Sequence, residues 1–154
     1  MESSKICNFG SNREAHSLLL RATLKTKKVL VQMKVYGIGL SKTGTSSLTE
    51  AFKILNFKSI HNPSQFLNLD EQGHLSIDFN RLEIYEAATD LEIAFFFEEL
   101  DVRFPNSKFI LTTREIGSWL KSCENHFNDD LQCSREEKAL LEKVYGTSIY
   151  NKDK

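Results

Sequence analysis

The chain has 154 residues, the length of one ordinary domain, and its 40% hydrophobic and 27% charged residues are typical of a globular protein. Its formal net charge is -1, so no overall electrostatic field attracts nucleic acid or an anionic membrane. The sequence holds no apolar run of bilayer length, no apolar core of a secretory signal, and no metal-like cysteine spacing. We therefore expect reduced thiols and a cytoplasmic protein with neither a membrane span nor a nucleic-acid partner.

Residues 1–32 differ in composition from the rest of the chain, with six lysines and arginines against two acids. Met33 follows directly, just before the first strand-like segment. We interpret 1–32 as a basic, disordered extension, or as the product of a start codon upstream of Met33. An organelle transit peptide is the alternative, since such peptides are basic and poor in acids. We expect residues 33–154 to form one α/β domain.

From Val35 onward, segments with strand character alternate with segments of helical periodicity. The stretch KVYGIGL (34–40) is short, apolar and partly β-branched, and TSSLTEAFKILNF (45–57) then places apolar residues at helical spacing. A second strand is expected in FKSIHN (57–62). The polar residues 62–78 predict a loop with at most one helical turn.

The middle of the chain repeats this pattern. FNRLEIYEAATD (79–90) predicts a helix followed by a short strand that ends at Asp90. LEIAFFFEELDVRF (91–104) predicts one helix, which stops before a proline and buries Phe96 and Leu100 on the same face. We regard burial of this face as a better explanation of its aromatic residues than a substrate pocket.

The last third supplies one strand and two helices. SKFILTTR (107–114) is the clearest strand, and EIGSWLKSCENHF (115–127) predicts a helix whose Trp119 we expect to pack in the core. SREEKALLEKVYG (134–146) predicts an amphipathic helix that ends at Gly146. The alternation of strands and helices predicts a parallel sheet flanked by helices.

The loop between the first strand and the first helix has the composition of an anion site. Gly39 and Gly44 are spaced as in the nucleoside-triphosphate loop G-x-x-x-x-G-K-[ST], but the lysine lies inside the loop, at Lys42. Glycines let successive N–H groups turn toward an anion, and the helix start adds its positive end. A plain strand-to-helix turn would explain the glycines and hydroxyls, but not the lysine. The expected anion ligands are Ser41, Lys42, Thr43, Gly44, Thr45 and Ser46.

Two further polar positions are predicted at the same edge of the sheet. Ligands of parallel sheets bind beyond the carboxyl ends of the strands, where Asp90 and Arg114 fall. An arginine there can bind phosphate bidentately, and Ser122 lies eight residues further along the chain. Taken alone, Arg114 is also explained by a surface ion pair with Glu115 or Glu124, and Ser122 by an ordinary helix surface.

Together, the motifs GLSKTGTSSL and FILTTREIGSWLKS resemble the sulfotransferase family, over roughly residues 33–150. The loop is similar to the family's 5′-phosphosulfate-binding loop, with lysine at the same internal place. Arg114 and Ser122 match the arginine and serine of its 3′-phosphate motif. The segment DLEIAFFFEELDVRFPNSKFIL also resembles one branch of the family. The resemblance implies an α/β three-layer sandwich with a short parallel sheet, similar to P-loop nucleoside-triphosphate hydrolases.

The resemblance also implies an activity. Family members move a sulfuryl group from 3′-phosphoadenosine 5′-phosphosulfate to a hydroxyl or amine, here of an unknown small-molecule or glycan acceptor. Lys42 would lie against the bridging oxygen of this donor, the loop hydroxyls would hold its 5′-phosphate, and Arg114 and Ser122 its 3′-phosphate. Because the donor is already activated, the chemistry requires no metal.

A transferase needs a base that takes the proton of the acceptor. In the resemblance this position corresponds to Asp90, although capping of the following helix by itself explains an aspartate there. His61 is the second candidate base, and an ordinary loop histidine is its alternative explanation. The other three histidines have no supporting context.

The sequence departs from the family pattern in two ways. Many cytosolic sulfotransferases have tryptophan at the position of Ser47, and typical members continue beyond the position of Lys154. The alternative function is therefore a non-catalytic nucleotide- or partner-binding relative that lost activity by truncation at the C-terminus. Apolar surface exposed in a shortened fold would favour a homo-oligomer. An ATP-dependent kinase is a weaker third hypothesis, because its loop requires lysine directly after Gly44.

Overall fold

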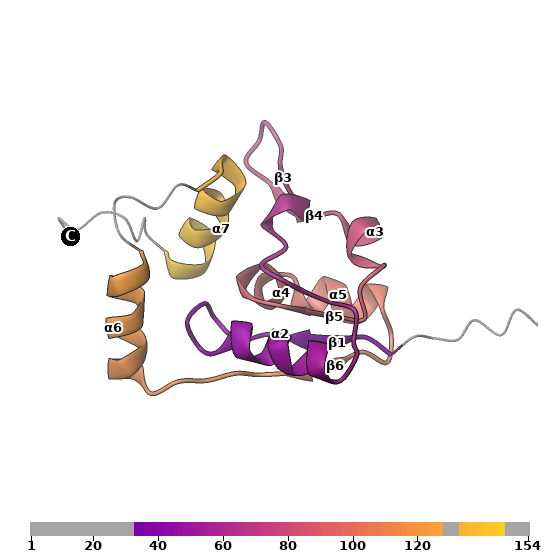
Figure 1. Cartoon of the computed structure of the whole chain (residues 1–154). Helices are drawn as coiled ribbons and strands as arrows, with labels where there is room; N and C mark the ends of the chain where they lie inside the picture. Colours follow the sequence, from indigo (N-terminus) through magenta and orange to yellow (C-terminus); the bar gives the residue numbers. More distant parts are fainter. Residues whose placement is uncertain (1–32, 128–132, 147–154) are drawn as a thin grey trace, which may run out of the picture. The chain divides into compact units, whose positions relative to one another are not determined.

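The computed structural model describes residues 33–127 and 133–146 (Figure 1). The basic extension predicted over 1–32 lies outside the described residues. The strands and helices that follow Met33 alternate as the sequence predicts. In the described part of the chain, no helix has the length and apolar character that a membrane span requires.

Four short parallel strands form the central sheet, in the order β2-β5-β1-β6. Gly37 in β1 pairs with Thr89 in β5 and Ile110 in β6, and Thr89 also pairs with His61 in β2. All four strands therefore end at one level, and the segments that follow them meet at one edge of the sheet. The strands are β1 (Val35–Gly37), β2 (Ser59–His61), β5 (Ala87–Thr89) and β6 (Lys108–Ile110).

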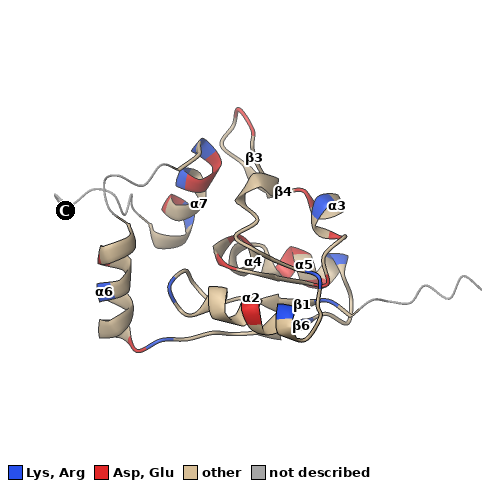
Figure 2. Ribbon diagram, viewed as in Figure 1, with Lys and Arg blue, Asp and Glu red and all other residues tan. Residues whose placement is uncertain are grey.

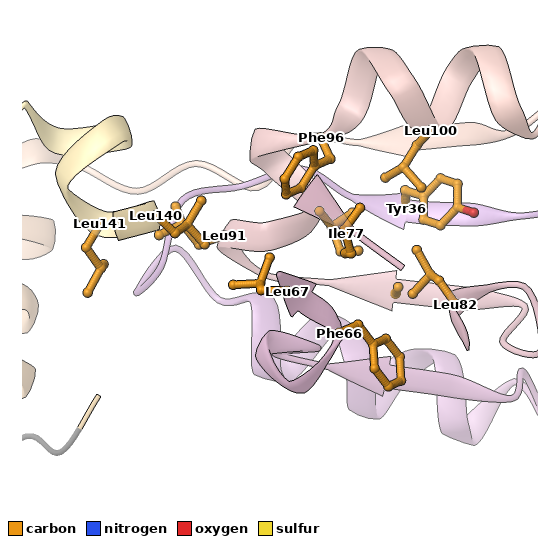
Figure 3. Close-up of a cluster of buried hydrophobic side chains, with 12 residues drawn as sticks. Tyr36, Phe66, Leu67, Ile77, Leu82, Leu91, Phe96, Leu100, Leu140 and Leu141 are labelled. Carbon is orange, nitrogen blue, oxygen red and sulfur yellow. The ribbon is translucent and has the colours of Figure 1, made fainter. Parts of the chain in front are cut away.

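Helices cover both faces of this sheet. Successive strand residues point to opposite faces, and Val35 and Ala87 pack with Phe52 of α2 on one face. Tyr36 and Ala88 join a larger cluster on the other face, with residues of α4, α5 and α7 (Figure 3). This arrangement confirms the α/β sandwich. The helices are α2 (Thr45–Ile54), α3 (Phe79–Leu82), α4 (Leu91–Phe95), α5 (Phe97–Arg103), α6 (Ile116–His126) and α7 (Arg135–Tyr145).

The polar segment 62–78 is more ordered than its sequence predicts. The expected helical turn is present as η1 (Ser64–Phe66), but an antiparallel hairpin of β3 (Leu67–Leu69) and β4 (Leu75–Ile77) follows it. The prediction of a loop was wrong here. The two strands were missed because each has only three residues and lies in a polar segment. Leu67 and Ile77 bury their side chains in the large cluster, and both strands contact α7.

The segment 91–104 forms two helices rather than the predicted one. The chain leaves helical geometry at Phe96, and α5 begins at the next residue. Phe96 and Leu100 are both buried, as predicted. The C-terminal helix α7 also agrees with the prediction, since Ser134 begins it with a capping box and Gly146 ends it in the left-handed conformation.

Candidate functional site

A cavity of about 540 Å³ lies beyond the carboxyl ends of the strands. It is lined by the loop after β1, by the residues that follow β2 and β5, and by parts of α6 and α7. The structure thus brings together residues that are up to about 100 positions apart in the sequence. The predicted site residues that line this cavity are Ser41, Lys42, Gly44, Thr45, Ser46, Asp90, Arg114 and Ser122.

The loop after β1 has a shape that only particular residues allow. Lys42 and Gly44 have positive φ angles of 70° and 100°. A Cβ atom at Gly39 would lie 1.9 Å from Thr112 Oγ1, so the loop could not pass this point with a larger residue. The N-cap of α2 is Gly44, which contributes no side-chain hydrogen bond to the helix start. The positive end of α2 is therefore directed at the cavity without a side-chain cap.

Thr43 is the one predicted loop ligand that the structure does not bring to the cavity. Its hydroxyl donates to the carbonyl of Leu40 at 2.6 Å and lies 2.8 Å from Thr112 Oγ1. The side chain lines a separate, mostly apolar cavity. We correct its role from a phosphate ligand to a brace that ties the loop to the segment after β6.

Arg114 reaches back to the same loop. Its Nη1 donates to the carbonyl of Lys42 at 3.1 Å, and no carboxylate in the described part of the chain forms an ion pair with it. Glu115 instead caps α6, accepting from the backbone N–H groups of Gly117 at 2.8 Å and Ser118 at 2.7 Å. These hydrogen bonds lower the pKa of the Glu115 carboxyl. The surface ion pair that could have explained Arg114 is therefore not formed.

Trp119 was predicted to pack in the core, and this prediction was wrong. Its Nε1 donates to the carbonyl of Ser41 at 2.9 Å, and its ring lies 6.2 Å from that of Tyr145. None of the residues of α6 is buried. The helix that carries Ser122 is thus held at the cavity by polar contacts with the loop, through Trp119 and Arg114.

Asp90 follows β5 directly and lines the same cavity as the loop. It has a φ angle of 100°, which is uncommon for a residue other than glycine and is often associated with functional sites. Within the described residues its side chain makes no capping hydrogen bond to α4, so the capping explanation is wrong. Its Oδ1 instead accepts from Ser41 Oγ and Thr45 Oγ1, each at 3.3 Å. The carboxylate therefore connects the loop to the end of the strand.

His61 is the last residue of β2, rather than a loop histidine. Its Nε2 lies 3.5 Å from Asp90 Oδ2 and 2.9 Å from Ser46 Oγ, and its Nδ1 lies 3.0 Å from Thr89 Oγ1. The Thr89 hydroxyl can donate to the Thr45 carbonyl at 3.3 Å, which favours donation from Nδ1–H to Thr89. In that tautomer, inferred from the hydrogen bonds, Nε2 is the nitrogen able to accept a proton.

Four titratable residues that the sequence analysis did not single out also line the cavity: Glu92, His126, Cys133 and Glu137. Glu92 is 3% exposed, and its Oε2 has no hydrogen-bond partner among the described residues. Burial, together with the charges of Asp90 and Glu137, raises its pKa to about 8. Burial and the charge of Lys42 lower the pKa of His126. The only sequence signal for Glu92 was an acid within an apolar helical segment.

The lining of the cavity therefore holds two sets of charged residues, which meet where Asp90 accepts from Ser41 and Thr45. We call Lys42, Arg114 and the loop 39–46 the cationic wall, and Asp90, Glu92 and Glu137 the acidic wall. In Figure 2 the ribbon of the loop before α2 has a blue segment, and α7 has both red and blue segments. No group of three or more potential metal ligands gathers within residues 33–127 and 133–146.

The family model described as "Sulfotransferase domain" matches residues 34–147. The chain belongs to the sulfotransferase family. It is also 35% identical to a protein named "Ava biosynthesis cluster protein M" from Aspergillus versicolor, over 60% of this chain and 42% of that protein. This sulfotransferase-family chain thus spans less than half the length of that relative.

Proposed function

We propose that the cavity binds 3′-phosphoadenosine 5′-phosphosulfate and that the chain transfers its sulfuryl group to a hydroxyl or amine acceptor. One observation carries the proposal: the cations Lys42 and Arg114 line the same cavity as a His61–Asp90 pair. Membership of the family supports sulfotransferase chemistry. The donor, and a small-molecule or glycan acceptor, belong to the proposal.

The donors of the cationic wall suit a ligand with two separated phosphates. Lys42 and Arg114 form no ion pair within the described residues, so their charges are available to a bound anion. Ser41, Ser46 and the start of α2 would hold the 5′-phosphate, whereas Arg114 and Ser122 would hold the 3′-phosphate. These groups need no metal to bind phosphate.

The donor supplies an activated sulfuryl group: a bond from the acceptor atom to sulfur forms, the bond from sulfur to the bridging phosphate oxygen breaks, and the acceptor loses one proton. His61 Nε2 takes this proton, and Asp90, 3.5 Å away, stabilises the imidazolium that results. Lys42 places a positive charge where the leaving phosphate becomes more negative. His61, Asp90 and Lys42 are the proposed catalytic residues.

A non-catalytic nucleotide- or partner-binding relative is the second candidate. The observation that favours it is the cationic wall itself, because Lys42 and Arg114 can bind a phosphate without any transfer. Such a relative would keep the cationic wall but transfer nothing. Transfer and nucleotide binding must therefore be measured separately.

The proposal is tested by following labelled sulfate from the donor to a panel of phenols, aliphatic alcohols and amines. We expect transfer by the wild-type chain and by Lys53→Ala, whose lysine is exposed and pairs with Glu50 at 2.7 Å. Transfer should fall by about 10²–10³-fold in Lys42→Ala and be strongly reduced in His61→Gln. Nucleotide binding without transfer to any acceptor would favour the second candidate, and the absence of both would contradict the proposal.

A further inference from the structure

We propose that the acceptor is a cationic molecule, an amino alcohol or amino phenol whose ammonium group binds the acidic wall of the cavity. This inference rests on the proposed function and deepens it by naming the acceptor class. It starts from the three carboxyl groups that line one cavity from two different elements, Asp90 and Glu92 at the start of α4 and Glu137 on α7.

Two of these carboxyl groups already have hydrogen-bond partners. Asp90 accepts from Ser41 and Thr45, and Glu137 accepts from the backbone N–H of Ser134 at 2.8 Å as part of the capping box of α7. Their positions are explained by the loop and by the helix start. They contribute negative charge to the wall, but they alone do not indicate a ligand.

Glu92 is different: it lies in the first turn of α4, but the helix start leaves one of its carboxyl oxygens without a partner among the described residues. The residue is 3% exposed, and its Oε2 is buried without a hydrogen-bond partner among the described residues. A buried carboxyl group in this state destabilises the folded protein. Glu92 lines the cavity although its burial destabilises the folded protein. A ligand that supplies the missing hydrogen-bond partner would explain its presence there.

The charges around Glu92 select a cation as that ligand. Asp90 and Glu137 both act on Glu92 with negative charge, so an ammonium group there would relieve repulsion and an anion would increase it. The cations Lys42 and Arg114 belong to the cationic wall and form no ion pair with these carboxylates in the described part of the chain. The other titratable residues that line the cavity are His61, His126 and Cys133.

The site also explains how such an acceptor would be oriented. Glu92 lies two residues after Asp90, whose carboxylate is close to His61 Nε2. An ammonium group at Glu92 and a hydroxyl group near His61 would occupy neighbouring parts of one wall. Glu92 is thus a positioning residue for the acceptor, and it takes no part in the transfer of the proton.

The test is calorimetric titration of the full chain with tyramine and with 4-ethylphenol, which share a phenol hydroxyl and differ by an ammonium group. Both titrations are done with and without adenosine 3′,5′-bisphosphate. We expect wild-type protein to bind tyramine at least about tenfold more tightly, a modest preference for one buried ion pair. Glu92→Gln should lose this preference, whereas Glu98→Gln, an exposed control on α5, should keep it.

A second readout separates recognition from a structural role. Because Glu92 holds its proton near neutral pH, binding of tyramine should release a proton, and the measured heat should change between buffers of different ionisation enthalpy. This proton release should disappear in Glu92→Gln, and in a variant that folds normally its loss cannot be attributed to a structural role.

Equal affinities for the two phenols, no binding of tyramine at millimolar concentration, or an unchanged preference in Glu92→Gln would overturn the inference. A tyramine preference without any binding of the bisphosphate would instead contradict the proposed donor and leave the cation site standing. Bisphosphate binding without a tyramine preference would contradict the cation site and leave the proposed donor standing.

Discussion

The two walls of the cavity are built in different ways. The cationic wall comes largely from one continuous loop, 39–46, and its ligands are lysine, hydroxyls and a helix start. The acidic wall combines the start of α4 with a residue of α7, more than 40 positions away. An anion site can be encoded locally, because backbone N–H groups supply much of it. Carboxylates that share a wall repel one another, so this wall exists only where the fold holds them together.

The largest expected effect tests the acidic wall through stability. The pKa of Glu92 is about 8 in the folded protein, above its ordinary value of 4.5, so the folded state binds more protons. Its contribution to stability is present below pH 4.5 and is lost as pH rises toward 8, by up to roughly 1.4 kcal/mol per pH unit. Glu92→Gln should flatten this decline, as measured by urea unfolding between pH 5 and pH 9. The same slope in both proteins would show that Glu92 is not buried as described.

The next effect tests the cationic wall through catalysis. Under the proposed function, Lys42→Ala removes the charge that would face the leaving phosphate, and loss of one such donor raises the barrier by about 2.7–4 kcal/mol. We expect kcat to fall by about 10²–10³-fold once an acceptor is known. Lys53→Ala is the matched control, because the exposed Lys53–Glu50 pair contributes little to stability. A normal rate in Lys42→Ala would remove lysine from the proposed mechanism.

A smaller effect tests the backbone of the loop. Gly39→Ala would place Cβ 1.9 Å from Thr112 Oγ1, and such overpacking costs about 1–3 kcal/mol of unfolding free energy. Gly117→Ala is the control, since a Cβ there meets only ordinary contacts, 3.4 Å from the Glu115 carboxylate oxygens. Because Gly117 lies in α6, its replacement should leave stability unchanged or raise it slightly. Thermal unfolding of both variants measures the difference, and equal stability would refute the described loop path.

The smallest expected effect concerns the contact that joins α6 to the loop. Trp119→Phe keeps an aromatic ring but removes the hydrogen bond to the Ser41 carbonyl, which contributes about 0.5–1.5 kcal/mol. Affinity for adenosine 3′,5′-bisphosphate should fall by less than in Arg114→Ala. A larger loss in Trp119→Phe than in Arg114→Ala would mean that Trp119 itself contacts the ligand.

Local patterns predicted the sheet, the position of the loop after β1 and the main helices, because each depends on the spacing of neighbouring residues. The β3–β4 hairpin was missed since its strands are short and lie in a polar segment. The break at Phe96 was missed because helical periodicity continues across it.

The placement of individual side chains was harder to predict. The Thr43 side chain points away from the cavity, and the Trp119 side chain lies outside the core. Contacts between distant segments decide both orientations. The role of Asp90 depends on a positive φ angle, which no sequence pattern predicts. Glu92 resembles any acid near a helix start until the fold buries it. The sequence therefore predicts the cationic wall far better than the acidic one.

The central claim is that the cationic wall binds a nucleotide with a 3′-phosphate. The most direct test is calorimetric titration with adenosine 3′,5′-bisphosphate, beside ATP with Mg²⁺, on wild-type protein, Arg114→Ala and the control Arg103→Ala, whose exposed arginine lies on α5. We expect the wild type and the control to bind the bisphosphate selectively. Arg114→Ala should bind it more weakly by about 1.5–3 kcal/mol, the contribution of a charge-assisted hydrogen bond. Unchanged binding by Arg114→Ala, or a preference for ATP with Mg²⁺, would contradict this account.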